Sequence, residues 1–121
     1  MNVKDKSILI TGAGGGLGSV MAHLLADNGA QVFILDLDAE KGQATADDIC
    51  AKGQRAWFFK MDVTSEADWK AVVDFAVEKT GKVDVVVNNA GINIRKPVEE
   101  MTIDEWCTMM KVNTGSVFLG C

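Results

Sequence analysis

Several features that would define other classes of protein are missing from this sequence of 121 residues. No apolar run approaches the roughly 20 residues of a membrane-spanning helix. The first residues, Met1 to Lys6, carry charges of both signs and precede only a short apolar run, which is not the pattern of a signal peptide. Basic residues form no cluster, and 17 acidic against 12 basic side chains give a net charge of −5. Nucleic acid and anionic membranes are therefore not expected as partners.

Cysteine, histidine and tyrosine are scarce or absent. The three cysteines, Cys50, Cys107 and Cys121, form no C-x-x-C pair, and such an odd, scattered set is typical of free thiols in a reducing cytoplasm. The single histidine, His23, is interpreted as a structural or surface residue, and the sequence contains no tyrosine. We expect a cytoplasmic protein without a metal site.

A glycine-rich stretch from Ser7 to Gly18 is the main signal that is present. An apolar run, Ile8–Ile10, gives way to glycines, and a helical pattern follows. A strand, a glycine-rich turn and a helix, in this order, are typical of the start of a nucleotide-binding βα unit. Glycine permits the tight turn and lets a phosphate approach the main chain, where the start of the helix can hold it. The helical spacing of three and four is carried by Leu17, Val20, Met21, Leu24 and Leu25.

Two common nucleotide motifs do not fit this stretch. In the fingerprint G-x-G-x-x-G, Leu17 stands where the third glycine is required, and no lysine follows the glycines as G-x-x-x-x-G-K-[ST] requires. The spacing that does fit is Thr11-Gly12-x-x-x-Gly16-x-Gly18. By itself this spacing also describes an ordinary turn between a strand and a helix.

Apolar runs alternate with helical patterns along the rest of the chain. Strands are expected at 7–11, 31–36, 55–62 and 83–87. Helices are expected from the glycines to about 28, from a cap at Asp38 to about 52, from a cap at Ser65 to Gly81, and after a capping box of Thr102 and Glu105. This alternation predicts an α/β fold with a parallel sheet and right-handed crossovers, formed as a single domain over residues 1–121.

Asp36 is a candidate ligand-binding residue because it ends the strand 31–36. At this place a carboxylate accepts hydrogen bonds from the adenosine ribose hydroxyls, and it repels the extra phosphate of NADP. Neither Gly15 in the loop nor Leu37 after the acid supplies a positive charge that would offset the repulsion. The alternative is an ordinary aspartate at a strand end.

Two further stretches follow strands. Asp62 and Val63 end the strand 55–62, where Asp62 would equally suit the start of the next helix. After the strand 83–87 comes Asn88-Asn89-Ala90-Gly91. Its small residues leave room for a ligand over the sheet edge, although Asn and Gly also form plain turns.

Taken together, the motifs resemble the short-chain dehydrogenase/reductase family in order and spacing, over nearly the whole chain. Asn113, in Val112-Asn113-Thr114-Gly115, is similar to the family's helix asparagine, which helps to hold the catalytic lysine through water. The resemblance implies a Rossmann-like doubly wound sheet of strand order 3-2-1-4 and NAD as cofactor, preferred over NADP. It implies contact of Asp62 with the adenine. The implied cofactor-binding residues are Gly12, Gly15, Gly16, Leu17, Gly18, Asp36, Leu37, Asp62, Val63, Asn89, Ala90 and Gly91.

The sequence departs from the family in its length and its catalytic residues. Family members are much longer, and their catalysis uses a tyrosine, a lysine four residues further on and an upstream serine. The helix asparagine is the fourth catalytic position of the family, and it is the only one of the four that this sequence matches, at Asn113. We expect the cofactor-binding half of the fold, ending after the helix that follows the fourth strand, either as a truncated product or as a naturally short protein. Hydride transfer between NAD and an alcohol or carbonyl is then not expected from this chain alone.

Two other functions remain open at this point. A non-enzymatic dinucleotide-binding module or sensor would use the same residues. A methyltransferase-like domain also pairs a glycine turn with a strand-end acid, but Asn88-Asn89-Ala90-Gly91 and Asn113 speak against it. The substrate is not indicated, because a small alcohol, a sugar acid or a steroid hydroxyl would all suit the family.

Self-association is expected from two exposed apolar elements. Without a fifth strand, the strand 83–87 is an open apolar edge. The last helix carries apolar residues around too much of its circumference to face only solvent, and in the family it packs between subunits. We expect a homodimer or a larger assembly through the edge, the helix or both. The apolar residues of the last helix are Trp106, Met109, Met110, Val112, Val117, Phe118 and Leu119.

Overall fold

The computed structural model describes residues 2–121 and shows one parallel sheet with the strand order β3-β2-β1-β4. This confirms the predicted Rossmann-like topology. The strands are β1 (Ser7–Thr11), β2 (Gln31–Asp36), β3 (Arg55–Lys60) and β4 (Val85–Val87). The helices are α1 (Gly16–Asp27), α2 (Ala39–Ala51), α3 (Glu66–Thr80), α4 (Ile103–Met110) and α5 (Ser116–Gly120), with a 3-10 turn, η1 (Val98–Glu100), and a π-helical turn, η2 (Lys111–Gly115).

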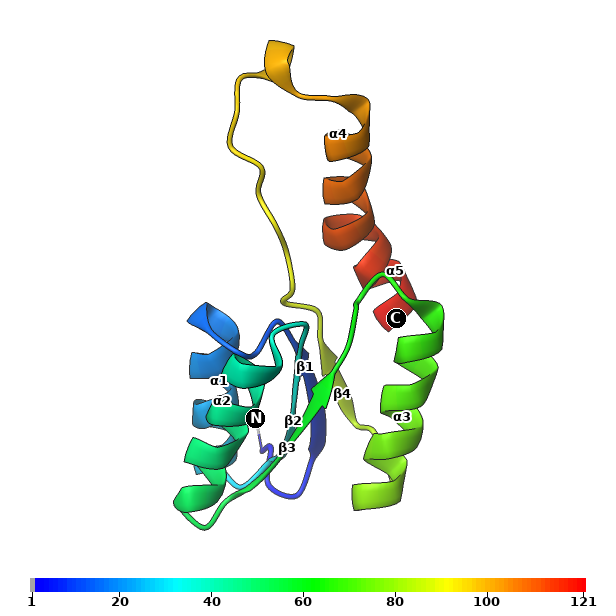
Figure 1. Cartoon of the computed structure of the whole chain (residues 1–121). Helices are drawn as coiled ribbons and strands as arrows, with labels where there is room; N and C mark the ends of the chain where they lie inside the picture. Colours follow the sequence, from blue (N-terminus) through cyan, green and yellow to red (C-terminus); the bar gives the residue numbers. More distant parts are fainter. Residues whose placement is uncertain (1) are drawn as a thin grey trace.

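Helices cover both faces of the sheet, with α1 and α2 on one face and α3 on the other (Figure 1). Alternate residues of β1 point to opposite faces, so Ile8 and Ile10 pack toward α1 and α2, whereas Leu9 packs with Phe33 and Trp69 on the α3 side. Burial on both faces explains why β1 and β2 read as continuous apolar runs rather than as alternating patterns.

Helix α1 packs on the sheet through its small residues. Gly18, Ala22 and Ala26 are buried, whereas three larger apolar residues of the predicted stripe are exposed and Leu25 is only partly buried against the core. The spacing therefore predicted the helix correctly but did not identify its buried face. Small residues face the sheet because α1 lies very close to the glycine loop: a Cβ on Gly18 would collide with the carbonyl oxygen of Gly12. Relative exposure reaches 77% for Leu17, 64% for Val20 and 61% for Leu24.

Strands β3 and β4 are shorter than the sequence predicts. In β3, pairing ends at Lys60, and the N–H of Asp62 donates to Oδ2 of Asp68 in α3 (2.8 Å) rather than to the sheet. At the start of β4, the Asp84 carboxylate accepts the backbone N–H of Ser7 (2.8 Å). The backbone N–H of Asp84 donates to the carbonyl of Ser7 (2.9 Å). The side chain therefore replaces only the backbone acceptor that the N–H of Ser7 would otherwise find in the next strand.

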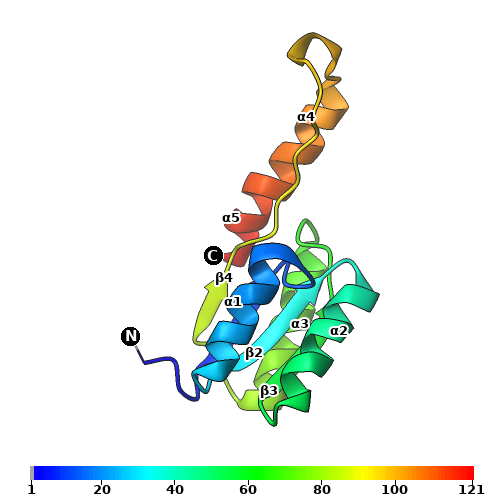
Figure 2. The ribbon, with the colours of Figure 1, turned by 90° about the vertical axis from the view of Figure 1, so that its left-hand side faces the viewer.

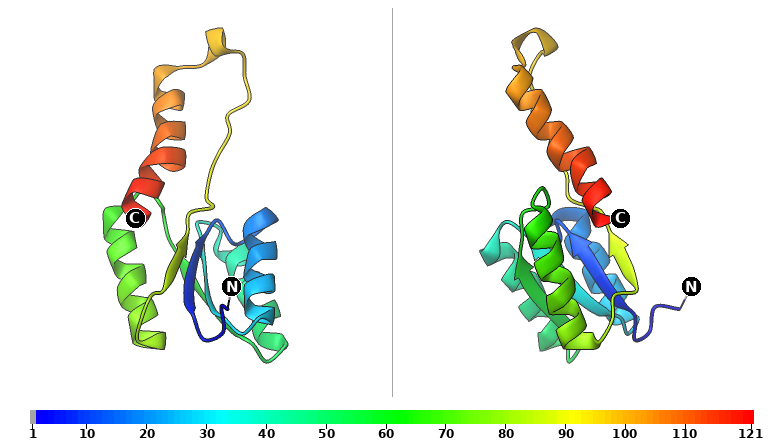
Figure 3. Two further views of the ribbon diagram at one scale, coloured as in Figure 1. Left: turned by 180° about the vertical axis from the view of Figure 1, so that it is seen from behind. Right: turned by 90° about the vertical axis from the view of Figure 1, so that its right-hand side faces the viewer.

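The last part of the chain forms an arm that extends away from the sheet (Figures 1 and 3). An extended segment, 91–97, leads outward to η1, and α4 returns toward the sheet with none of its eight residues buried. The capping box of Thr102 and Glu105 is present as predicted. The expected single helix is divided by η2, after which α5 reaches α3.

Replacing Gly18 by alanine will destabilise the fold, because the added methyl group must push the glycine loop from the helix. We expect Gly18→Ala to lower the free energy of unfolding by about 1–3 kcal/mol, measured by urea denaturation. Gly115→Ala is the matched control, since a Cβ there meets only the carbonyl oxygen of Met110 at 3.9 Å and the backbone is helical, and it should not lower the free energy of unfolding. Equal losses for both variants would contradict this account of the packing.

Candidate functional site

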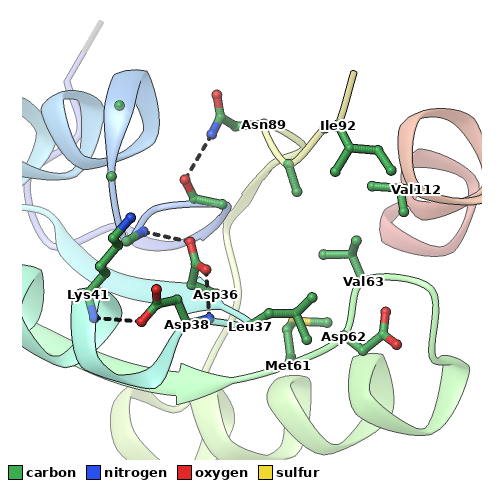
Figure 4. A pocket seen from close by; sticks show the side chains of 16 residues that line it. Asp36, Leu37, Asp38, Lys41, Met61, Asp62, Val63, Asn89, Ile92 and Val112 are labelled. Atoms are coloured by element: carbon green, nitrogen blue, oxygen red, sulfur yellow. Dashed lines mark hydrogen bonds between the residues drawn. The ribbon is translucent and has the colours of Figure 1, made fainter. Parts of the chain in front are cut away.

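A pocket of about 470 Å³ opens where the strands end at their carboxyl side (Figure 4). The turns that follow all four strands contribute to its wall, together with η2. Ligands of open α/β sheets bind at this end, where the connections diverge to opposite faces. The lining residues are Gly12, Gly14, Gly15, Gly16, Asp36, Leu37, Asp38, Lys41, Met61, Asp62, Val63, Asn89, Ala90, Gly91, Ile92 and Val112.

Most of the predicted cofactor-binding residues meet in this pocket although they come from distant parts of the sequence. The exceptions are Leu17 and Gly18, which lie just inside α1. Leu17 is 77% exposed, and Gly18 is buried beneath the loop. Asn113 also lies outside the lining and contacts the loop after β4 from the arm. The residues predicted from the sequence that do line the pocket are Gly12, Gly15, Gly16, Asp36, Leu37, Asp62, Val63, Asn89, Ala90 and Gly91.

The glycine loop gives the pocket an open helix N-terminus. Gly12 and Gly16 have positive φ angles of 65° and 56°, which residues with a side chain rarely adopt. Gly15 is the N-cap of α1, and no side chain accepts a hydrogen bond there. The first-turn N–H groups of α1 are therefore available to an anion such as a pyrophosphate.

Asp36 links the end of β2 to the glycine loop. Its Oδ2 accepts the N–H of Gly14 (2.9 Å) and its Oδ1 accepts the N–H of Asp38 (2.9 Å). Gly14 was not among the predicted site residues, yet a Cβ there would lie 2.9 Å from Asp36 Oδ2. The sequence signal that could have identified it is the Gly12-x-Gly14 pair, which the longer spacing through Gly16 obscured.

Thr11 and Asn89 join the glycine loop to the end of β4. The hydroxyl oxygen of Thr11 accepts the N–H groups of both Asn89 and Ala90 (3.0 Å each). The amide Nδ2 of Asn89 donates to the carbonyl oxygens of Thr11 (3.0 Å) and Gly12 (3.3 Å). The side chains of Thr11 and Asn89 thus fix the walls of the pocket on both sides of the β1–β4 junction.

Asp62 is held in its ionised form at the end of β3. Its Oδ1 accepts the hydroxyl (2.7 Å) and the N–H (2.8 Å) of Thr64. These hydrogen bonds, chiefly the one from the hydroxyl, hold the pKa of the Asp62 carboxyl below its usual value, and Lys111 adds to the effect. A carboxyl with a lowered pKa favours the folded state at neutral pH and loses that contribution as the pH falls through the lowered value.

Asn113 connects the arm to the pocket. Its Oδ1 accepts the N–H of Ile92 and its Nδ2 donates to the carbonyl of Ile92, both at 2.8 Å. The residue lies in the π-helical turn η2, a distortion that is frequent at functional sites. The reciprocal pair fixes the segment after Gly91 where it passes the pocket.

Lys41 is a lining residue that the sequence reasoning missed. Among the pocket residues in the described part of the chain it is the one cation, and Figure 4 shows its side chain beside Asp36 and Asp38. Asp38 caps α2 by accepting the backbone N–H of Lys41 (3.0 Å). The cap that the sequence predicts at Asp38 could have identified this residue, because it places Lys41, the third residue of α2, at the edge of the pocket.

The same residues, 2–121, contain no helix that is both long and apolar enough to cross a membrane. Within that range no group of three or more His, Cys, Asp and Glu residues is arranged to hold a metal ion. The pocket is therefore best described by its glycines, carboxylates and amides.

Comparison with known proteins agrees with this arrangement. A family model described as short chain dehydrogenase matches residues 6–121. The chain is 39% identical over 118 residues to a cyclopentanol dehydrogenase from Comamonas sp., covering 98% of this chain and 47% of that protein. It is 36% identical to a 3-beta-hydroxysteroid dehydrogenase from Comamonas testosteroni, covering 98% and 46%. A crystal structure of a short chain dehydrogenase from Mycobacterium smegmatis superposes with a TM-score of 0.93 at 36% identity, covering 98% and 50%.

The chain belongs to the short-chain dehydrogenase/reductase family, a family of oxidoreductases that bind nicotinamide dinucleotide cofactors. It spans about half the length of the curated relatives it matches.

Removing the hydroxyl of Thr11 will loosen the junction between β1 and β4. In Thr11→Val the N–H of Ala90 loses its acceptor, and the N–H of Asn89 keeps only the carbonyl of Val87 (3.0 Å). We therefore expect the free energy of unfolding to fall by about 1–3 kcal/mol. Thr108→Val is the matched control, since Thr108 is exposed on α4, and it should change stability by less than about 0.5 kcal/mol. Urea denaturation measures both variants, and an unchanged midpoint for Thr11→Val would show that the hydroxyl is dispensable.

Proposed function

We propose that this chain is the cofactor-binding part of a dehydrogenase that transfers a hydride between NAD and an alcohol or carbonyl substrate. The observation that carries the proposal is the position of Asp36, beside the glycine loop and within one pocket with the open N-terminus of α1. An anionic pyrophosphate suits the helix end, and a carboxylate suits the ribose hydroxyls. The family membership and the order of the motifs support the same function.

The residues of the pocket fit a nicotinamide dinucleotide. The N–H groups at Gly15 and Gly16 would hold the pyrophosphate, Asp36 the adenosine ribose, and Leu37, Asp62 and Val63 the adenine. Beyond them, Ala90 and Gly91 keep the other end of the pocket free of bulky side chains. The dinucleotide, when bound, supplies the hydride acceptor or donor.

The proposal also includes a preference for NAD over NADP. The carboxylate of Asp36 would lie where the additional phosphate of NADP would come, and two negative charges at that distance repel each other. Lys41 on the neighbouring turn acts in the opposite sense and limits the discrimination. The three exposed free cysteines suit a reducing compartment, and we place the protein in the cytoplasm on that ground.

A non-enzymatic dinucleotide-binding module is the second candidate function. It would use the same pocket for the dinucleotide, and these 121 residues contain no tyrosine that could serve as the family's proton donor. Both candidates share the cofactor pocket, and they differ in whether catalytic groups are supplied from outside these residues.

Titration of NAD and NADP will measure the role of Asp36. We expect the wild-type chain to bind NAD at least tenfold more tightly than NADP, which is about 1.4 kcal/mol. Asp36→Ala should bring the two dissociation constants together, mainly by strengthening the binding of NADP. Lys41→Ala should act oppositely and widen the ratio by weakening the binding of NADP.

Two substitutions outside the pocket serve as controls for that titration. Asp48→Ala removes an exposed carboxylate from α2, and Lys70→Ala removes an exposed cation from α3. Both should leave the ratio of the two dissociation constants unchanged. Equal binding of NAD and NADP by the wild type would refute the assignment of Asp36, whether or not the pocket binds a dinucleotide.

The purified chain of 121 residues should not oxidise alcohols or reduce carbonyls at an enzymatic rate. No tyrosine is present to exchange a proton with the substrate oxygen, and Asn113 cannot take that part. An assay against a panel of alcohols with NAD, followed by absorbance of the reduced cofactor, tests this. Gly16→Asp is the control, because it places a negative charge at the phosphate position. Turnover that this variant abolishes would reveal chemistry in the pocket that the proposal does not contain.

A further inference from the structure

Thr45 is a buried polar residue of α2 that does not line the pocket. Helices α1 and α2 lie side by side on one face of the sheet (Figure 2), and the relative exposure of Thr45 is 6%. Its hydroxyl oxygen lies 3.1 Å from the carbonyl oxygen of Lys41, 3.4 Å from that of Gly14 and 3.5 Å from Oγ of Ser19. The bond to Lys41 is the usual one of a helical threonine to its own helix. The other two contacts reach the glycine loop and α1.

Glycines bring the start of α2 close to the glycine loop. A Cβ on Gly42 would collide with the ring of Phe58, so this glycine lets α2 lie directly against β3. A Cβ on Gly14 would come within 3.1 Å of the backbone nitrogen of Gly42, so the loop and the helix touch at this point. This close approach brings the hydroxyl of Thr45 within reach of the Gly14 carbonyl.

The peptide group between Gly14 and Gly15 is the part of the loop that Thr45 contacts. In a planar trans peptide the C=O and the N–H point in opposite directions. Because the Gly14 carbonyl faces α2, the N–H of Gly15 points away from α2, and Gly15 lines the pocket. Within residues 2–121 no protein group accepts this N–H, so it is free to donate to a ligand.

Glycine on both sides makes this peptide easy to turn over. Neither Gly14 nor Gly15 has a Cβ, so rotation of the peptide between them meets little steric resistance. Asp36 fixes the N–H of Gly14 (2.9 Å), and the N–H of Ser19 donates to the carbonyl of Gly15 (3.3 Å). Both of these groups belong to the neighbouring peptides. In the described part of the chain, Thr45 is the one hydrogen-bond partner of the peptide itself.

We propose that Thr45 is a positioning residue for the glycine loop. Its hydroxyl holds the Gly14 carbonyl toward α2 and thereby keeps the N–H of Gly15 directed into the pocket. The inference rests on the proposed function only in taking the pyrophosphate of a dinucleotide as the ligand of this N–H. A phosphate oxygen that accepts the N–H polarises the peptide and strengthens the hydrogen bond at its other end. Thr45 should therefore affect the binding of phosphate groups more than the binding of the adenosine.

NMR of the ligand-free chain tests the positioning itself. Thr45→Val keeps the shape of the side chain and removes the hydroxyl, so the Gly15 amide signal should shift and broaden as its peptide exchanges between two orientations. Thr45→Ser, which keeps the hydroxyl, should restore the wild-type signal. Thr108→Val is the matched control, because the Thr108 hydroxyl donates to the carbonyl of Asp104 in its own helix (2.8 Å), far from the loop in sequence. An unchanged Gly15 signal in Thr45→Val would overturn the proposal.

Titration with ADP and with adenosine tests the consequence for binding. In Thr45→Val the dissociation constant of ADP should rise about fivefold, as expected for about one hydrogen bond, and that of adenosine should change by less than about twofold. Equal weakening of both ligands would show that Thr45 acts through the general packing of α2, which would overturn the proposal. If the wild type binds neither ADP nor adenosine, the proposed function fails, and the NMR comparison alone confirms or overturns the role of Thr45.

Discussion

The pocket depends on the hydrogen bonds that close the junction between β1 and β4. These two strands are neighbours in the sheet but are separated by two βα units in the sequence, so their ends must be joined by side chains. The hydroxyl of Thr11 accepts two N–H groups from the segment after β4, and the Asn89 amide donates back to two carbonyls of the glycine segment. Partly buried backbone groups are costly to leave without such partners, so the turn after β1 and the turn after β4 are fixed together.

Asp36 has a corresponding effect on the other side of the glycine loop. It holds Gly14 through one carboxylate oxygen and Asp38 through the other. The same side chain that would recognise a ribose therefore also positions the loop that would bind the phosphates. Since both oxygens already accept backbone N–H groups, the carboxylate is oriented before any ligand arrives, and little ordering remains to be done on binding.

Much of the fold could be predicted because strands buried on both faces and capped helices leave strong local patterns. The alternation of strands and helices and the caps at Asp38 and Ser65 followed from local patterns, and the strand order followed from the resemblance to the family. The buried face of α1 did not, because hydrophobicity favours Leu17 and Leu24, whereas close packing favours Gly18 and Ala22.

Lys41 and Gly14 escaped the sequence reasoning for a related reason. The Gly12-x-Gly14 pair and the cap at Asp38 were present in the sequence as signals, but neither shows by itself that the two residues face the same pocket. The start of β4 was also misjudged, since at Asp84 one hydrogen bond to Ser7 is made by the backbone N–H and the other by the side-chain carboxylate. Tertiary contacts of this kind are decided by which groups meet in space, and a local pattern carries no information about them.

The π-helical turn η2 also determines how the apolar residues of the arm are shared between surfaces. A wider turn holds an additional residue, and one residue corresponds to about 100° of rotation in an α-helix. The side of α5 that packs toward α3 carries Leu119, whereas Trp106 and Met110 of α4 stay about half exposed. Without the wider turn, α5 would be rotated by about that angle relative to α4 and would turn a different side toward α3. One additional residue thus decides which side chains of the arm the sheet takes.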